Sequence, residues 1–275
     1  MKRFTVHFSM LLFSMLLLNG LSSTSSLGNE TIPGWALGFD GSDNFLMCPN
    51  IPAYRTHNFT VELWAKQTLA NPTGSRVLVS TLGYMPNGGW QVCASPWFRF
   101  TFRSGGTGYF VDPPTTTLPI GEWVHLAVSY IDNGVNATVS FYINGDRLHQ
   151  TTLAGVIIDY VETSPTLFIG ANIDWQTEIR EFPGEIDEVR IWGYCRTSSE
   201  IKAAMNRRLN ADDRANPMLL AYWPFEEGAG LCTSDLSLNA IPCSLHNGVQ
   251  WVQNMIPIST TRSGWGIIKS LFRRD

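Results

Sequence analysis

The chain has 275 residues, of which 15% are charged and 12% are aromatic, and its formal net charge is −4. This composition is that of a globular protein and excludes a disordered or fibrous chain. The mild acidity and the lack of a Lys/Arg cluster inside the folded part argue against a nucleic-acid partner and suit the binding of cations.

The N-terminus, residues 1–26, has the pattern of a secretory signal peptide. Lys2 and Arg3 precede an apolar run from Phe8 to Leu18, and small polar residues follow. A membrane anchor is the alternative, but the run is shorter than the ~20 apolar residues that a spanning helix needs. We therefore expect a secreted, extracellular protein, whose net charge changes from −4 to −6 when Lys2 and Arg3 are removed.

Residues 34–252 are predicted to form one domain, followed by a tail over residues 253–275. Within the domain, short runs of alternating apolar and polar residues are separated by turns rich in Gly, Pro and Asn, as in an antiparallel β-sandwich. The expected strands cover residues 36–40, 45–48, 59–66, 77–82, 97–103, 166–171, 184–192 and 219–225. The predicted fold class is therefore all-β, a jelly roll of two antiparallel sheets.

The clearest strand pattern runs from Gly121 to Leu148 and predicts a three-stranded meander. Two alternating arms are joined by a turn at Asp132-Asn-Gly134, and Asn144-Gly145 signals a type I′ turn into a third strand. The apolar face of this meander needs a second layer. The residues expected in the core between the two sheets are Phe98, Phe100, Phe102, Val124, Leu126, Val128, Phe141, Ile143, Val189 and Ile191.

One short helix is expected over residues 197–209. Thr197-Ser-Ser-Glu200 has the spacing of a capping box, in which the two end side chains bond each other's backbone. Ile201, Met205 and Leu209 then recur every four residues, which gives the helix a single apolar stripe. We expect this stripe to dock on the sandwich.

Five cysteines in an exported chain favour disulfides, and five allow fifteen arrangements of two bridges and one thiol. Cys232 and Cys243 flank a polar loop and are the first pair that we predict. The second predicted pair is Cys48 with Cys93. Cys195 is then the remaining thiol, and we expect it to be packed rather than reactive.

Three Asn-X-Thr sequences, which begin at Asn29, Asn58 and Asn136, are acceptors for N-glycosylation if the source is a eukaryote. Asn71 is excluded by the proline that follows it. Asn136 lies beside the meander turn, where a glycan has room. The sequence therefore predicts a glycoprotein only under that condition.

The strand over residues 97–103 places Trp97, Arg99 and Arg103 on the face opposite its phenylalanines. Aromatic rings and planar guanidinium groups suit flat binding surfaces, so this face is a candidate platform for sugar stacking. An ordinary solvated strand surface is the alternative interpretation.

Six motifs carry a family resemblance: Ala36-Leu-Gly-Phe-Asp-Gly-Ser-Asp43, Phe59-Thr-Val-Glu-Leu-Trp64, Gly121-Glu-Trp-Val-His-Leu-Ala127, Phe141-Tyr-Ile-Asn-Gly145, Leu167-Phe-Ile-Gly170 and Gly184-Glu-Ile-Asp-Glu-Val-Arg-Ile-Trp192. In this order they resemble the laminin-G-like jelly rolls of the concanavalin A-like lectin/glucanase superfamily, on its pentraxin-like side. The resemblance covers about residues 34–252. It is specific to the fold and says little about function, because sandwich folds host many functions.

The resemblance implies a calcium site, because pentraxin-like domains bind calcium between loops on one face. The ligands that it implies are Asn87, Asn172, Asp174, Glu178 and Glu181. Their side-chain oxygens suit calcium, which takes six to eight oxygen ligands. Departures from the family pattern at Ile173, Arg180 and Gly88 restrict the expectation to one ion, and an ordinary polar rim of loops is the alternative.

The motif that begins at Gly184 looks like the catalytic strand of laminarinase-type glucanases. Glu185 and Asp187 fit its alternating carboxylates, but Val189 occupies the third position. Retaining glycosidases need two carboxyl groups about 5–5.5 Å apart, and these two residues share a face. Asp187 also shares that face with Val189 and Ile191, so the structural interpretation is a buried, hydrogen-bonded carboxylate.

The C-terminal tail carries Trp265, Ile268 and Leu271 at helical spacing, with Lys269 and Arg273 on a basic side. A basic amphipathic helix can lie on an anionic membrane. A helix of about 11 residues that is weakened by glycines is, however, marginal in water. We expect a disordered or loosely packed tail, with membrane contact as the alternative.

The leading functional prediction is a secreted, non-catalytic recognition module that binds glycan or an extracellular protein surface, with calcium as its implied cofactor. A structural or adhesive extracellular protein without a small ligand is the second hypothesis. An unusual glycoside hydrolase is the third, disfavoured by the missing third carboxylate at Val189.

Overall fold

The computed structural model describes residues 30–69, 75–82, 88–94, 98–114, 117–160, 166–172 and 181–258. Sheet A contains β1 (Glu30–Asp40), β3 (Asn58–Gln67), β8 (Trp123–Asp132), β9 (Ala137–Ile143), β10 (Asp146–Leu153), β12 (Pro183–Trp192), β13 (Leu219–Trp223) and β16 (Gln250–Ile258). Sheet B contains β2 (Phe45–Pro49), β4 (Arg76–Ser80), β5 (Trp90–Ala94), β6 (Arg99–Ser104), β7 (Thr107–Val111), β11 (Thr166–Ile169), β14 (Cys232–Thr233) and β15 (Cys243–His246).

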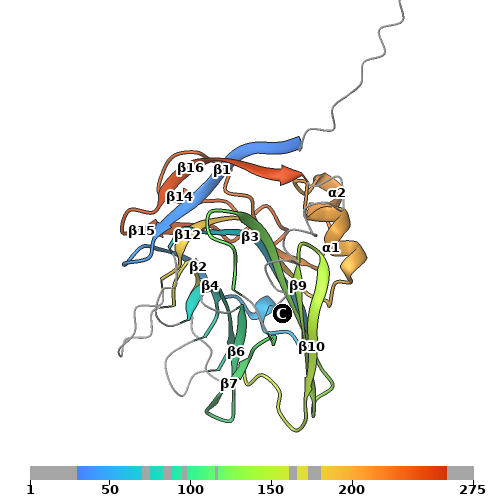
Figure 1. Ribbon diagram of the computed structural model, residues 1–275. Coiled ribbons are helices and arrows are strands. Elements are labelled where there is room, and N and C mark those ends of the chain that lie inside the picture. The colour runs from blue at the N-terminus through green and yellow to red at the C-terminus, as the bar shows by residue number, and fades with distance from the viewer. Residues whose placement is uncertain are drawn as a thin grey trace, which may run out of the picture.

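The two sheets face each other (Figure 1). One hydrophobic core, with side chains from both sheets, lies between them. The strand order is β10-β9-β8-β3-β12-β1-β16 in sheet A, where β13 also pairs with β12, and β14-β15-β2-β11-β4-β5-β6-β7 in sheet B. Neighbouring strands are antiparallel throughout the paired segments that the structure describes. The predicted all-β sandwich of two antiparallel sheets is therefore confirmed. The domain division at residues 34 and 252 stays a prediction.

The predicted meander is formed by β8, β9 and β10, which are neighbours in sheet A. Asn144 and Gly145 both have positive φ, 49° and 76°, as the type I′ turn between β9 and β10 requires. All ten residues that the sequence placed in the core are buried. Their aromatic members interlock across the sheets: the rings of Phe98 and Phe141 meet edge to face, 5.2 Å apart between centroids.

The expected helix is α1 (Ser198–Ala204), which begins at the predicted capping box. Its apolar stripe is buried as predicted, and Ile201 packs with Ala127 and Tyr142 on the outer face of sheet A. The helix ends at Ala204, five residues earlier than residue 209, and Arg190 of β12 donates hydrogen bonds to the carbonyls of Ala204 and Arg207, which satisfies carbonyl groups that the helix leaves without partners at this end. A second short helix, α2 (Ala211–Arg214), and a 3₁₀ turn, Pro52–Tyr54, complete the helical elements of the described chain.

A buried ionic network lies beneath α1. Oε1 of Glu62 accepts hydrogen bonds from Nη1 of Arg196 at 2.5 Å, Nε1 of Trp192 at 3.0 Å and Nη1 of Arg190 at 3.4 Å. Burial alone would raise the pKa of Glu62, but the guanidinium groups of Arg196 and Arg190 hold this pKa below its ordinary value. The two arginines therefore keep a fully buried carboxylate charged, and they tie β3 and β12 to the helix.

Candidate functional site

Side chains of β6 point alternately into the core and toward the outer face of sheet B. Because Phe100 and Phe102 enter the core, the neighbouring residues of this strand project outward. On the adjacent strand, Phe110 lies directly opposite Thr101. Two residues further along each strand, the carboxylate of Asp112 accepts two hydrogen bonds from the guanidinium group of Arg99, each 2.7 Å long. We call Arg99, Thr101, Phe110 and Asp112 the Phe110 platform.

The Phe110 ring is the exposed part of this platform, with 64% of the residue accessible to solvent. The guanidinium carbon of Arg99 lies 5.1 Å from the ring centroid. The hydrogen bonds that Arg99 donates to Asp112 raise the pKa of the guanidinium group, so the cation is fixed in place beside the ring. The result is an open aromatic surface with an oriented ion pair at one side.

The rest of this face is largely covered. Thr101 is 4% exposed, and its hydroxyl makes no hydrogen bond with any residue that the structure describes. Arg103, which the sequence analysis placed on the candidate sugar-stacking face, is 9% exposed and lies opposite Gly108. Trp97, the third predicted ligand-binding residue, lies outside the described residues. The accessible surface is therefore centred on Arg99 and Phe110 rather than on Arg103.

Two of the predicted calcium ligands can be placed. Asn172 follows β11 and donates a hydrogen bond from Nδ2 to Oε1 of Gln91, 3.0 Å away. Gln91 lies opposite Thr101, so Asn172 reaches the same face as the platform. Glu181 comes close to Asn172 in the fold, because the N–H of Phe182 bonds the carbonyl of Gly170 at 2.8 Å. Asn87, Asp174 and Glu178 lie outside the described residues, and among the described ones no three acidic, His or Cys side chains are grouped for a metal.

Sequence reasoning missed Phe110, although one signal pointed toward it. Gly105 and Gly106 both have positive φ and form the turn between β6 and β7. A Gly-Gly turn after an alternating strand predicts a return strand, and register then places Phe110 beside Thr101 on the outer face. Of the predicted calcium ligands, Asn172 reaches the platform region through its bond to Gln91.

Residues 40–202, more than half of the chain, match the profile of the concanavalin A-like lectin/glucanases superfamily. The chain belongs to this superfamily. This confirms the resemblance that the six motifs indicate. No curated protein matches the chain in sequence.

Solved structures show the same superfamily fold at low identity. A Bacteroides ovatus protein provisionally described as carbohydrate binding shares 18% identity with a TM-score of 0.61; the match covers 82% of this chain and 62% of that one. The native heptameric SAP-like pentraxin of Limulus polyphemus shares 13% identity with a TM-score of 0.52; the match covers 83% of this chain and 98% of the pentraxin. The chain thus spans less than two thirds of the Bacteroides protein.

The strand that resembles superfamily glucanases differs from the predicted alternation. Glu188 has a positive φ of 54° and forms a bulge, so that Ile186 and Val189, three residues apart, both enter the core. Asp187 therefore does not share the face of Val189, which corrects the prediction. It is 3% exposed, as the structural interpretation expected, and it accepts hydrogen bonds from Nδ2 of Asn254 and the N–H of Glu188.

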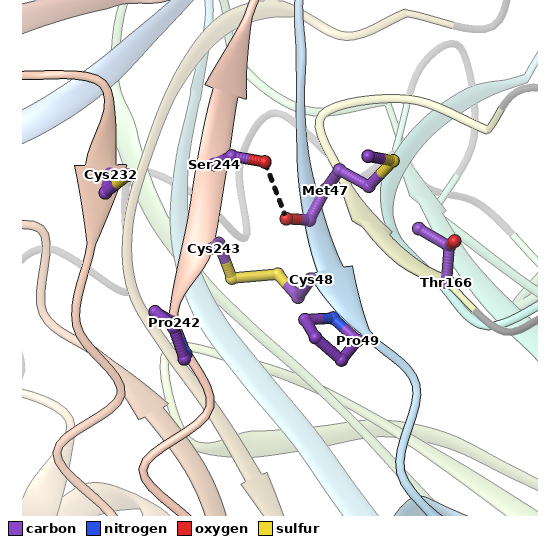
Figure 2. A pocket seen from close by; sticks show the side chains of 8 residues that line it. All are labelled: Met47, Cys48, Pro49, Thr166, Cys232, Pro242, Cys243 and Ser244. Atoms are coloured by element: carbon purple, nitrogen blue, oxygen red, sulfur yellow. Dashed lines mark hydrogen bonds between the residues drawn. A yellow bond between two sulfur atoms is a disulfide. The ribbon is translucent and has the colours of Figure 1, made fainter.

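The disulfide joins Cys48 of β2 to Cys243 of β15 (Figure 2). Both predicted pairs, Cys232 with Cys243 and Cys48 with Cys93, are therefore wrong. Cys232 lies opposite Ser244, one residue out of step with Cys243, and its side chain is exposed. Cys93 lies on β5, three strands away from Cys48 in sheet B. Cys195 is outside any disulfide, as predicted, and donates its thiol to the carbonyl of Tyr130.

An open hollow of about 440 Å³ lies beside this disulfide (Figure 2). Met47, Pro49 and Pro242 form apolar parts of its wall, while Thr166 and Ser244 add two hydroxyl groups. No Asp, Glu, Lys or Arg lines it. We therefore place the candidate binding surface of this superfamily member at the Phe110 platform and not at the hollow.

Proposed function

We propose that the chain is a secreted, non-catalytic module that binds glycans on the Phe110 platform. The observation that carries the proposal is an aromatic ring, 64% exposed, beside a bidentate Arg99–Asp112 pair on the outer face of sheet B. The apolar face of a sugar ring packs on an aromatic side chain, and its hydroxyl groups bond nearby charged groups.

The superfamily and its structural neighbours agree with this proposal. One neighbour is provisionally described as a carbohydrate-binding protein. Secretion is supported by the leader pattern over residues 1–26 and by the disulfide, a bond typical of oxidising compartments. Within the described residues, no helix has the length and apolar character needed to cross a membrane.

Burial of Asp187 supports the non-catalytic part of the proposal. Glycoside hydrolysis requires two carboxyl groups that flank the sugar. Asp187 is covered by β16 through its bond to Asn254, and Glu185 is engaged by Nζ of Lys66 at 2.8 Å. A sugar has no access to Asp187 in this arrangement.

Calcium enters the proposal as one ion beside the platform, held by the loops that contain Asn87, Asn172, Asp174, Glu178 and Glu181. The support is that Asn172 reaches Gln91 on the face of sheet B that carries the platform. Calcium titrated by calorimetry should bind, and it should raise the melting temperature of the intact protein by mass action. Asp174→Ala should weaken calcium binding and lower the melting temperature only when calcium is present. Identical melting curves of the intact protein with calcium and with chelator would remove the ion from the proposal.

A glycan array probed with the full chain tests the main proposal. Phe110→Ala should weaken binding at least about tenfold, equivalent to roughly 1.4 kcal/mol. The matched control is Val135→Ala, which removes an equally exposed apolar side chain from the β8–β9 turn of the other sheet. Unchanged binding by Phe110→Ala would move the site elsewhere. Absence of glycan binding in both calcium and chelator would favour the adhesive hypothesis, and release of reducing sugar would favour the hydrolase.

A further inference from the structure

Two of the three Asn-X-Thr sequences lie in the described part of the chain, and the fold brings them to one end of sheet A. Asn58 opens β3 and is opposite Ile131 near the end of β8. Asn136 ends the turn that joins β8 to β9. A backbone hydrogen bond from Asp132 to the carbonyl of His57 ties this turn to the start of β3. The two acceptor sequences are thus neighbours in space although they are far apart in the chain.

Both side-chain amide nitrogens are available. Asn58 is exposed, and Asn136 is half-buried with its Oδ1 accepting the N–H of Gly155 at 2.9 Å. Neither Nδ2 atom donates a hydrogen bond to a residue that the structure describes. A substituent on Nδ2 of Asn136 leaves Oδ1 free to keep its bond to Gly155. Attachment of a glycan to Nδ2 is therefore compatible with the hydrogen bond that holds this turn.

Each acceptor sequence has an exposed apolar side chain beside it. Ile131, opposite Asn58, is 44% exposed, and Val135, next to Asn136, is 62% exposed. Such side chains favour association with other apolar surfaces when nothing covers them. A glycan at either asparagine is large enough to shield them and is strongly hydrated.

We propose that Asn58 and Asn136 are N-glycosylation sites, and that their glycans shield Ile131 and Val135. In the transfer, Nδ2 attacks the anomeric carbon of a lipid-linked oligosaccharide pyrophosphate, so that a C–N bond forms and the C–O bond to pyrophosphate breaks. The lipid pyrophosphate leaves with the bonding electrons, and the amide nitrogen loses one proton. The proposal rests on export through a eukaryotic secretory pathway and is independent of glycan binding at the Phe110 platform.

The test is expression of the full chain in eukaryotic secretory cells, followed by treatment of the secreted protein with an amidase specific for N-glycans. We expect a mass loss on treatment, and conversion of both Asn58 and Asn136 to Asp in peptides analysed by mass spectrometry. Asn58→Gln should remove one glycan, and Thr138→Val should remove the other while leaving the bond between Asn136 and Gly155 in place. The matched control Thr138→Ser keeps the acceptor sequence and the hydroxyl that meets Thr152, so its glycan should remain.

The shielding is measured on the secreted protein by light scattering after size exclusion. The variant that combines Asn58→Gln with Thr138→Val should self-associate more than the glycosylated protein, and adding Val135→Ser should reverse the increase. Retention of the chain in the cytosol, a secreted chain without a mass loss, or conversion at Asn29 alone would each overturn the glycosylation. Equal self-association of glycosylated and unglycosylated protein would overturn the shielding.

Discussion

Nδ2 of Asn172 bonds Oε1 of Gln91 at 3.0 Å, and both residues are buried. This contact holds the segment after β11 against the outer face of sheet B, next to Thr101 and the Phe110 platform. It joins two parts of the sequence that are 81 residues apart. A buried pair of amide side chains therefore joins the start of the segment after β11 to the region that we propose for ligand binding.

A double-mutant cycle tests whether the two amides stabilise the fold as a pair. Gln91→Ala and Asn172→Ala should each lower the free energy of unfolding by about 1–3 kcal/mol, because each leaves a buried amide group without its partner. The double variant should cost less than the sum of the two, measured by urea unfolding. Gln150→Ala, at an exposed amide that bonds Ser140, is the control and should cost under about 1 kcal/mol. Additive costs would show that the two amides act independently.

The disulfide should contribute strongly to stability, because Cys48 and Cys243 close a loop with a sequence separation of 195 residues. Replacing both with Ala should lower the free energy of unfolding by about 2–5 kcal/mol in non-reducing urea titrations. Cys232→Ser, at an exposed thiol, is the control and should change it by less than about 0.5 kcal/mol. A peptide map that pairs Cys232 with Cys243 instead would contradict the structure.

Glu62→Ala should be among the most destabilising single substitutions in sheet A. It leaves the buried guanidinium groups of Arg190 and Arg196 without their shared carboxylate, at a cost of about 3–5 kcal/mol in thermal or urea unfolding. The comparison is Asp146→Ala, which removes the partner of Lys202 from a solvent-exposed ion pair and should cost about 0–1 kcal/mol. Similar costs for the two variants would show that the buried network is not held together as the structure indicates.

His125 should make the protein sensitive to acid. Burial lowers the pKa of His125 from its ordinary 6.5 to about 3. The carboxylate of Glu62 opposes this shift, whereas the positive charges of Arg190 and Arg196 add to it. Between these two pH values the unfolded chain binds one proton more than the folded protein. The free energy of unfolding should therefore fall as pH falls through this window, by up to about 1.4 kcal/mol per pH unit from this residue.

The variant His125→Phe removes the imidazole that binds this proton in the unfolded chain. The unfolding free energy of the variant should therefore depend less steeply on pH between 6.5 and 3 than that of the parent protein. The measurement is urea unfolding at a series of pH values, compared as slopes rather than as absolute stabilities. A slope that His125→Phe does not alter would show that His125 is not the acid-sensitive group.

The sequence predicted the elements whose signals are local. The turn at Asn144-Gly145 needs two residues with positive φ, and the capping box of α1 needs two side chains three residues apart. The alternation of β6 and β8 identified the core-facing residues correctly, because successive side chains of a strand point to opposite faces. The candidate site was predicted in part: Arg99 lies on the open face, while Phe110 was missed and Arg103 is largely covered.

Sequence by itself determined the clearly alternating strands, the turn at Asn144-Gly145, the start of α1 and the core-facing residues, because these features follow from steric and hydrogen-bonding rules that act over a few residues. Only the tertiary structure decided what meets across distant strands. Strand order and register bring Cys48 opposite Cys243, and the bulge at Glu188 turns Asp187 away from the face that simple alternation assigns to it. Register also places Phe110 beside Thr101 on the outer face of sheet B, where the exposed ring meets Arg99. These contacts depend on how the two sheets pack as wholes, which no short stretch of sequence encodes.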